Sequence, residues 1–407
     1  MRVPCHALLL ALLLSGSLAG GAAPLRAQTA PAASPLPRDT SSAAVLTARI
    51  TRTLVRHGFS DVAAVVQGAR VYVAFENTRY RDDRRALGEA AALVLAEFDG
   101  ARELVLVPTS RAVPFVAVRY AGATAPAEAS LDLSPVPAAL GAAPRAGSSS
   151  GRLDVVVHPW FEAVFGDYDD PVASRTGVAP ELRVALRRGL GLSAQALVTV
   201  QDDVPTGESR VRPGLVALNR TVRLPRGVFV SATAGTFTPD RYGVDVEARA
   251  YFRNGRWSAG AQTALTGEVS YAREGWRRAP MDDPTALVDV AWRGARHDLL
   301  LRATGGAFLG RERGVRLDVV RQFGELEVGW FAMRTARGAN GGATLRIPLL
   351  PARHAAPGPV RVRAADAFPW QYRYRGYLSG GRPYRTGYSL DELVRGLHPD
   401  HVVNGDR

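Results

Sequence analysis

The side chains best suited to chemistry in this chain are carboxylates and arginines that alternate with apolar residues. Asp245, Glu247 and Arg249 form one such series, with one residue between each. Side chains at this spacing lie on one face of a strand, where opposite charges pair with each other or bind charged and hydroxylated ligands. Aromatic residues beside arginines near the C-terminus suit sugar rings and acidic groups. The candidate glycan contacts are Asp245, Glu247, Arg249, Gln262, Glu268, Arg302, Arg316, Trp370, Tyr372 and Tyr374.

Other residues that could do chemistry lack the right neighbours. Gly189-Leu190-Gly191-Leu192-Ser193-Ala194 imitates a dinucleotide-binding loop, but it lies between predicted strands with no helix after it. Three aspartate pairs lie in predicted loops with too few ligands for calcium, and three histidines lack metal-ligand spacing. These are Asp169-Asp170, Asp202-Asp203, Asp282-Asp283, His57, His158 and His297. The sequence therefore predicts no catalytic residue, no cofactor and no metal site, and a non-enzymatic protein.

A predicted hairpin from Val244 to Tyr271 positions the first series of charged residues. Its turn is Asn254-Gly255, the strongest short-range hairpin signal, because both central residues of a type I′ turn need positive φ. A two-residue turn fixes the register and pairs Phe252 with Trp257 and Glu247 with Gln262. One face is then almost entirely apolar and the other charged, and a slip of one residue would mix the two sets.

Alternation of this kind continues through residues 152–350 and predicts about twelve strands. A membrane barrel and a soluble sandwich both have one apolar face, so the alternation does not separate them. The connections favour the barrel, because tight ones such as 189–191 alternate with long ones such as 166–180 and 272–284. Outer-membrane barrels have short periplasmic turns and longer outer loops, whereas Greek-key sandwiches do not sort their loops by parity. We predict a mainly β fold, an up-and-down antiparallel outer-membrane β-barrel with its charged face lining the lumen.

Four segments precede the predicted barrel. Residues 1–27 resemble a secretory signal peptide, with a short apolar run and small residues before the cut. Residues 28–43 are predicted to be a disordered lead-in. Residues 44–122 are predicted to form a small α/β domain, in the order α-β-β-α-β-β, that lies in the periplasm. Residues 123–151 are rich in Ala, Pro, Gly and Ser and are predicted to be a linker.

The C-terminal tail, residues 351–407, is rich in aromatic residues and arginine. An even number of strands returns this tail to the side of the N-terminal domain. Its aromatic residues could contact sugar, or could belong to an edge strand or a periplasmic plug. Ser389-Leu390-Asp391-Glu392 has the pattern of a capping box and predicts a short helix to about Leu397.

The composition limits the choice of partners. The formal net charge is +13, and all 51 basic residues are arginine. These arginines are spread along the chain rather than clustered, and no nucleic-acid-binding module is evident, so a nucleic-acid partner is not predicted. The single cysteine, Cys5, lies in the predicted signal peptide, so no disulfide is expected. An anionic polysaccharide or a lipid headgroup is the better candidate partner for an exported protein of this charge.

Three stretches carry a family resemblance. Residues 236–247, Thr-Phe-Thr-Pro-Asp-Arg-Tyr-Gly-Val-Asp-Val-Glu, enter a strand through glycine and end on glutamate. The second stretch is residues 316–324, Arg-Leu-Asp-Val-Val-Arg-Gln-Phe-Gly, and it is followed by Gly329, Thr335, Gly341-Gly342 and Ile347-Pro348-Leu349. The third stretch, residues 75–80, is Phe-Glu-Asn-Thr-Arg-Tyr. Together these stretches resemble the YjbH family. The resemblance implies an outer-membrane β-barrel protein associated with exopolysaccharide production and export.

Three hypotheses about function follow. The first is a non-enzymatic outer-membrane barrel that assists exopolysaccharide biosynthesis or export, with a polysaccharide, outer-membrane lipid and periplasmic export components as partners. The second is a general porin or structural barrel. The third is a secreted β-rich enzyme or glycan-binding protein, which predicts solubility without detergent.

Overall fold

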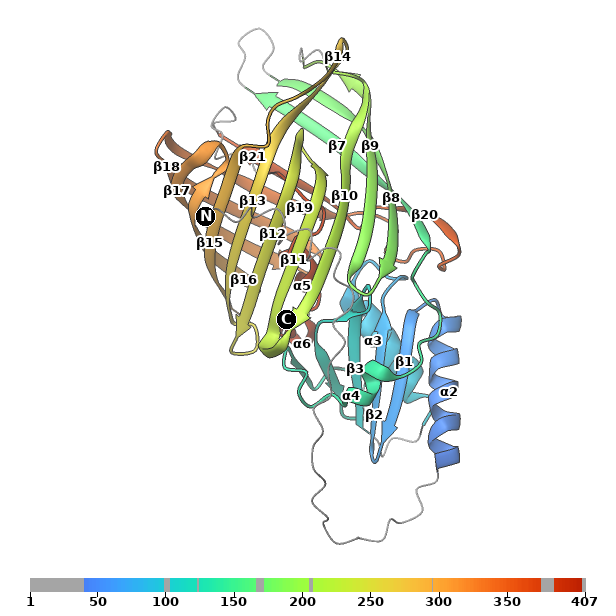
Figure 1. Ribbon diagram of the computed structural model, residues 1–407. Coiled ribbons are helices and arrows are strands. Elements are labelled where there is room, and N and C mark those ends of the chain that lie inside the picture. The colour runs from blue at the N-terminus through green and yellow to red at the C-terminus, as the bar shows by residue number, and fades with distance from the viewer. Residues whose placement is uncertain are drawn as a thin grey trace, which may run out of the picture.

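The computed structural model describes residues 40–98, 103–122, 124–165, 172–204, 208–294, 296–374 and 384–404. The predicted signal peptide, 1–27, lies outside these ranges, as does most of the predicted lead-in, 28–43. The described chain is mainly β, as predicted, and contains one sheet of six strands and one of fifteen. In Figure 1 the smaller sheet and its helices lie beneath one end of the larger sheet.

The N-terminal unit, residues 40–142, contains the predicted α-β-β-α-β-β series and adds two short strands and a further helix. Its elements are α2 (Thr40–Arg56), β1 (Ser60–Gln67), β2 (Arg70–Glu76), α3 (Asp83–Leu95), β3 (Glu103–Ser110), β4 (Val113–Pro114), β5 (Ala117–Tyr120), β6 (Glu128–Ser130) and α4 (Ala138–Ala142). The additions are β4, β6 and α4. The sheet order is β1-β2-β3-β5-β6, and β2 and β3 are parallel. Ile50 and Leu54 of α2 and Leu87 of α3 share one core with residues of the strands. No helix in the described ranges is long and apolar enough to cross a membrane.

The prediction that residues 123–151 form a linker is wrong for much of that segment. Strand β6 pairs with β5, and the neighbouring Leu131 is buried in the core shared with α2 and α3. Helix α4 buries Leu140 in a second cluster, with Tyr72 and Val105. Burial of these two leucines contributes about 1.5–3 kcal/mol each, and the Arg145–Asp61 ion pair adds a further contact between this segment and β1.

Twelve long strands make up most of the large sheet. They are β7 (Leu153–Phe165), β8 (Val172–Arg187), β9 (Leu190–Asp202), β10 (Val211–Leu224), β11 (Val228–Phe237), β12 (Arg241–Phe252), β13 (Trp257–Ala272), β15 (Asp283–Gly294), β16 (Leu299–Phe308), β17 (Glu312–Phe323), β18 (Leu326–Thr335) and β19 (Gly338–Pro348). Each pairs in antiparallel fashion with the next along the chain, as predicted for an up-and-down sheet. A short strand, β14 (Gly275–Arg278), folds back on β13.

The β12–β13 hairpin has the predicted register, including the pairs Phe252–Trp257 and Glu247–Gln262. The turn is longer than the predicted two residues: residues 253–256 connect the strands, and Arg253, Asn254 and Gly255 have positive φ, at 49°, 56° and 91°. Alternation alone did not decide which face of the hairpin would be exposed, and the predicted barrel places the charged face inside.

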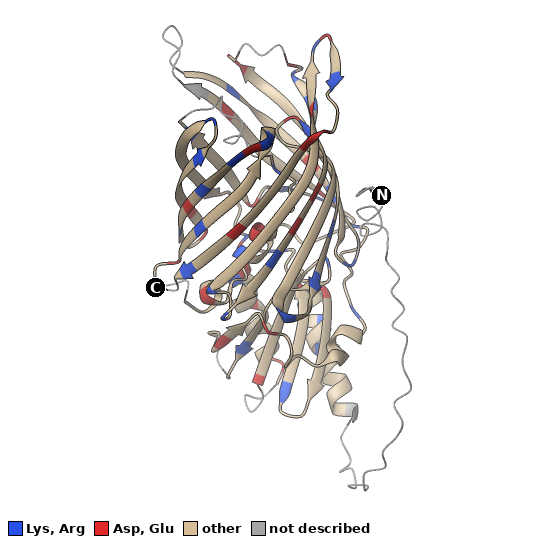
Figure 2. Cartoon of the chain, turned by 60° about the vertical axis from the view of Figure 1, so that its left-hand side comes forward, with Lys and Arg blue, Asp and Glu red and all other residues tan. Residues whose placement is uncertain are grey.

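The apolar face of the large sheet is the exposed one. Val288 on β15, Leu317 on β17 and Trp330 on β18 are 64%, 57% and 59% exposed. The charged residues of the opposite face are covered, with Asp245 and Arg249 only 1% and 8% exposed. Figure 2 shows basic and acidic residues along the strands from one end of this sheet to the other. This is the reverse of a water-soluble sheet, in which the apolar face is covered.

The predicted sorting of the connections by length holds only in part. At the end next to the N-terminal unit the connections are short, including 188–189, 253–256 and 324–325. At the opposite end, 203–210 and 273–282 are longer, but 336–337 is as short as any. The alternation therefore holds at 203–210 and 273–282 but fails at 238–240, 309–311 and 336–337.

The C-terminal tail supplies a strand to each edge of the large sheet. Strand β20 (Val360–Ala364) is parallel to β7, and β21 (Ala367–Arg373) is antiparallel to β19. Only Ala365 and Asp366 separate β20 from β21, and the N–H of Ala365 donates to the carbonyl of Val157 on β7 (3.0 Å). The edge-strand interpretation of the tail is confirmed, and the predicted end of the sheet at residue 350 is wrong.

Candidate functional site

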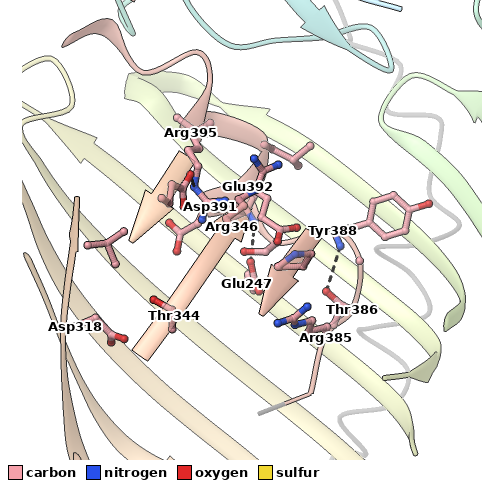
Figure 3. Close-up of a pocket in the computed structure, with 18 of the residues that line it drawn as sticks. Glu247, Asp318, Thr344, Arg346, Arg385, Thr386, Tyr388, Asp391, Glu392 and Arg395 are labelled. Atoms are coloured by element: carbon pink, nitrogen blue, oxygen red, sulfur yellow. Dashed lines mark hydrogen bonds and ion pairs between the residues drawn. The ribbon is translucent and has the colours of Figure 1, made fainter. Parts of the chain in front are cut away.

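A cavity of about 840 Å³ lies against the charged face of the large sheet. Its wall is built by the long strands, by β21 and by part of the C-terminal segment, residues 384–404. Figure 3 shows Asp391, Glu392 and Arg395, from helix α5 (Leu390–Arg395), among the side chains that line it. Cavities of this size bury most of the surface of a small organic ligand.

Most charged side chains of the wall are ion-paired. On β17, Arg316 donates to Asp318 through Nε and Nη2, at 2.9 and 2.7 Å. Arg249 on β12 reaches across to Asp289 on β15, with Nη2 2.9 Å from the carboxylate. Further pairs are Arg183–Glu181, Arg293–Asp298 and Arg395–Glu327. Charges removed from water need such partners, because an uncompensated buried charge costs several kcal/mol.

The C-terminal segment runs along β12 on this charged face. At one end, the backbone of Arg385 exchanges hydrogen bonds of 2.6 and 3.2 Å with Thr238, in the connection between β11 and β12. At the other end, His398 Nε2 lies 3.0 Å from the carbonyl oxygen of Gly255, in the turn between β12 and β13. Between these points, the hydroxyl of Tyr384 donates to Asp245 on β12 (2.6 Å). The segment therefore spans the length of β12.

The N-terminus of α5 is capped by the sheet rather than by its own capping box. Ser389 occupies the N-cap position, but its side chain makes no capping hydrogen bond. The carboxylate of Glu247 on β12 accepts the backbone N–H of Leu390 instead (2.9 Å). The predicted helix is confirmed, and the predicted cap is wrong: Ser389 makes no capping hydrogen bond, and Glu247 accepts the N–H of the first helical residue.

Asp391 is the central ion-pair partner of the C-terminal segment. Its carboxylate lies 3.1 Å from Arg249 Nε and also pairs with Arg302 on β16. Asp289 contacts the same two arginines, at 2.9 and 3.5 Å, so two carboxylates and two guanidinium groups form one cluster. Burial raises the pKa of Asp391, but the charges of Arg302 and Arg249 outweigh it and hold this pKa well below its usual range.

The rest of the C-terminal segment joins the N-terminal unit to the large sheet. His401, on α6 (Pro399–Asn404), lies 3.0 Å from the carboxylate of Asp298, while burial lowers the pKa of His398 to about 3. His398 is therefore neutral where it meets Gly255. Four apolar residues of the segment share the core of the N-terminal unit: Leu390, Val394, Leu397 and Val402.

The N-terminal unit itself contacts the end of the large sheet that has the short turns. Arg111 donates to Asn219 and Thr221 on β10 (2.9 and 3.2 Å), and its guanidinium lies 4.7 Å from the centre of the Tyr388 ring. The backbone N–H of Leu131 donates to Asn254 in the β12–β13 turn (3.0 Å). The prediction that this unit lies on the short-turn side is confirmed. The tail, predicted for the same side, instead supplies β20 and β21 to the sheet and runs along β12.

The structure brings together most of the sequence-predicted contacts. Glu247, Arg249, Gln262, Arg302, Arg316 and Trp370 belong to the cavity wall. Asp245 lies on the same face, where it accepts from Tyr384 and Gln262. Glu268 stands apart, with its side chain 76% exposed. Tyr372 stacks on Trp370 with ring centres 6.4 Å apart, and Tyr374 is 72% exposed, so neither belongs to the cavity wall.

The aspartate pairs have structural partners where they are described. Asp202 pairs with Arg175 and Asp283 with Arg241, whereas Asp169-Asp170 lies outside the described residues. Within the ranges that the structure covers, no group of three or more His, Cys, Asp or Glu residues could hold a metal ion.

Sequence reasoning missed three residues at the centre of the site: Asp391 as an ion-pair partner, and Arg346 and Arg385 as wall residues. Asp391 was noticed only as part of a capping box. A charged residue in a short helix with Leu390, Val394 and Leu397 nearby is the signal that could have indicated a buried partner for the charged face of the sheet.

Comparison of the chain with protein-family models, curated proteins and solved structures finds no match. The resemblance to the YjbH family stays a prediction from the residues.

Proposed function

We propose that this chain is an integral outer-membrane β-barrel protein of a Gram-negative-type envelope that assists the production and export of an exopolysaccharide. It catalyses no reaction in this proposal. The N-terminal unit, a small α/β domain, lies in the periplasm. The C-terminal tail, predicted for the periplasm, instead contributes β20 and β21 to the barrel and residues 384–404 to its lumen. Outer-membrane lipid, a polysaccharide and periplasmic export components are its partners.

The observation that carries the membrane location is the inversion of the large sheet. Large apolar residues such as Val288, Leu317 and Trp330 are more than half exposed on one face, while arginines and carboxylates are covered on the other. In water, each large side chain left exposed forgoes about 1.5–3 kcal/mol of burial. In lipid the same arrangement is favourable, because apolar side chains face the acyl chains and charged ones face a polar interior.

Closure of the sheet is supported by the segment that contains β20 and β21. A lipid-embedded sheet cannot leave edge N–H and C=O groups unpaired, because no water is present to satisfy them. Residues 360–373 pair with both β7 and β19, the two ends of the twelve-strand series. In the proposal this segment closes the barrel.

The lumen of this barrel is partly filled. The C-terminal segment spans β12, and the N-terminal unit contacts the short-turn end. This arrangement favours a protein whose lumen is regulated by a partner over a permanently open general porin.

The exopolysaccharide role rests on the family resemblance and on where its residues lie. Asp245 and Glu247, in the first stretch, are the groups of β12 that hold Tyr384 and Leu390 of the C-terminal segment. Asn77, in the N-terminal stretch, donates to Asp83 and to the carbonyl of Tyr80 (both 2.8 Å), which fixes the start of α3. The resembling stretches thus support the contacts that organise the lumen.

The membrane half of the proposal is tested by gel mobility of the protein from purified outer membranes, with and without boiling. A closed barrel stays compact in detergent and migrates faster before boiling. Recovery of the folded chain in the soluble fraction without detergent would contradict the proposal and favour a secreted β-rich protein.

The export half is tested by deleting the gene and measuring polysaccharide inside and outside the cell. The proposal predicts less secreted polysaccharide with continued intracellular synthesis. Unchanged secretion, together with liposome conductance that needs no polysaccharide partner, would contradict it in favour of a general porin.

A further inference from the structure

Two arginines of the cavity wall have no carboxylate partner. Eight arginines line the cavity, and six of them form ion pairs: Arg183, Arg249, Arg293, Arg302, Arg316 and Arg395. For Arg346 and Arg385, no ion pair or side-chain hydrogen bond occurs within the described chain. In a wall where the other arginines are neutralised, these two are available to a ligand.

The two arginines are held by different elements. Arg346 lies on β19 opposite Glu327 of β18, but Glu327 is occupied by Arg395 (2.9 Å). Arg385 belongs to the C-terminal segment, and its backbone is fixed by Thr238 while its side chain is exposed. Figure 3 shows both among the side chains lining the cavity. A ligand that contacts both arginines would bridge the sheet and the C-terminal segment.

Polar groups without charge lie beside Arg346. Thr344, two residues earlier on β19, faces Gln371 across the β19–β21 pair. The Gln371 side-chain nitrogen is buried and makes no hydrogen bond within the described residues. A buried N–H without a partner is unfavourable, so this amide is a donor available to a ligand's acceptor.

These groups match the chemistry of a sugar acid. A guanidinium group binds a carboxylate through two parallel hydrogen bonds, and amide and hydroxyl groups bind sugar hydroxyls. Two carboxylates of the wall lack an ion pair within the described chain: Glu247 accepts the backbone N–H of Leu390, and Glu392 is exposed on α5. Neither of them pairs with Arg346 or Arg385. A neutral glycan would leave both guanidinium groups without a counter-charge, whereas a chain of sugar acids supplies one at each residue.

We infer that the cavity binds a carboxylated saccharide chain, with Arg346 and Arg385 each holding a carboxylate and Gln371 and Thr344 binding sugar hydroxyls. The inference rests on the proposed function and names the class of its polysaccharide.

The test is binding to the full-length protein in detergent, measured by titration calorimetry with an oligogalacturonate of four residues. Its fully methyl-esterified form has the same backbone without the charges and is the matched neutral ligand. The variants are Arg346→Gln and Arg385→Gln. Arg334→Gln is the matched control, because Arg334 is exposed on β18 without an ion pair among the described residues. The gel-mobility shift of each variant verifies that it is folded.

The expected result is saturable binding of the acid, weak or absent binding of the ester, and a loss of about tenfold or more in affinity for each cavity variant. That factor corresponds to the loss of one charge-assisted contact. Equal binding of acid and ester would overturn the inference, as would equal loss in Arg334→Gln, or inorganic phosphate binding as tightly as the oligosaccharide. Failure of the proposed function is seen separately, as unchanged secretion in the deletion strain while the cavity still binds the acid.

Discussion

Replacing Asp391 with asparagine is predicted to loosen the C-terminal segment from the large sheet. The substitution keeps the shape of the side chain and removes the charge shared by Arg249 and Arg302. Removing one partner of a buried ion pair costs about 3–5 kcal/mol. Here both arginines keep Asp289, and the Asp391 side chain is 22% exposed, so we expect about 2 kcal/mol. This corresponds to roughly a thirtyfold rise in the undocked fraction of the segment.

Hydrogen exchange of the α5 amides, residues 390–395, measures this change in the detergent-solubilised protein. Glu392→Gln is the matched control, because it neutralises the adjacent carboxylate, which makes no ion pair within the described chain. The expected result is faster exchange in Asp391→Asn and near-native exchange in Glu392→Gln, with β12 unchanged in both. Equal exchange in the two variants would refute the role assigned to the Asp391 cluster.

The remaining predictions concern pH and backbone conformation. In the docked segment the pKa of His398 is about 3, below the ordinary value of 6.5. Neutral His398 therefore contributes fully to docking above pH 6.5, and this contribution is lost as the pH falls towards 3. At pH 5 protonation of His398 weakens docking by about 2 kcal/mol. The variant His398→Gln keeps a donor for the carbonyl of Gly255 but does not titrate. Hydrogen exchange of the segment should therefore lose this pH dependence in His398→Gln. Burial raises the pKa of Asp83 to about 6, so the charged carboxylate destabilises the fold at high pH. Urea unfolding should therefore show that Asp83→Asn stabilises the protein by up to about 3 kcal/mol at pH 8 and by little near pH 4. Gly255 has positive φ, and a Cβ added there would lie 2.6 Å from His398 Nε2. Gly324 also has positive φ, but a Cβ added there would have nothing within 4 Å. Thermal unfolding should therefore show a cost of about 1 kcal/mol for Gly324→Ala and a larger cost for Gly255→Ala.

The large sheet could be predicted from the sequence because its signals are local. Asn254-Gly255 fixes the turn, and alternation on either side fixes the register that pairs Glu247 with Gln262. Which face is covered could not be read from alternation, because a membrane barrel and a soluble sheet share the pattern. The exposure of Leu317 and the burial of Asp245 decide it.

The C-terminal segment could not be placed from the sequence, because its structure depends on partners far away in the chain. A helix as short as Leu390–Arg395 is unstable alone, so local propensity says little about where it docks. Its position is set by Glu247 at its N-terminus and by Arg249 and Arg302 at Asp391. The connection 336–337 is short for a related reason, because cross-strand pairing extends β18 and β19 towards each other.

The central claim is that the large sheet is a closed barrel with its apolar face in lipid. Single-cysteine labelling along β17, from Val315 to Val319 in purified outer membranes, tests it most directly. A nitroxide at each position reports collisions with oxygen, which concentrates in lipid, and with a water-soluble nickel complex. The proposal predicts oxygen-accessible labels at Val315, Leu317 and Val319 and nickel-accessible or occluded labels at Arg316 and Asp318. Nickel access at all three apolar positions would contradict it.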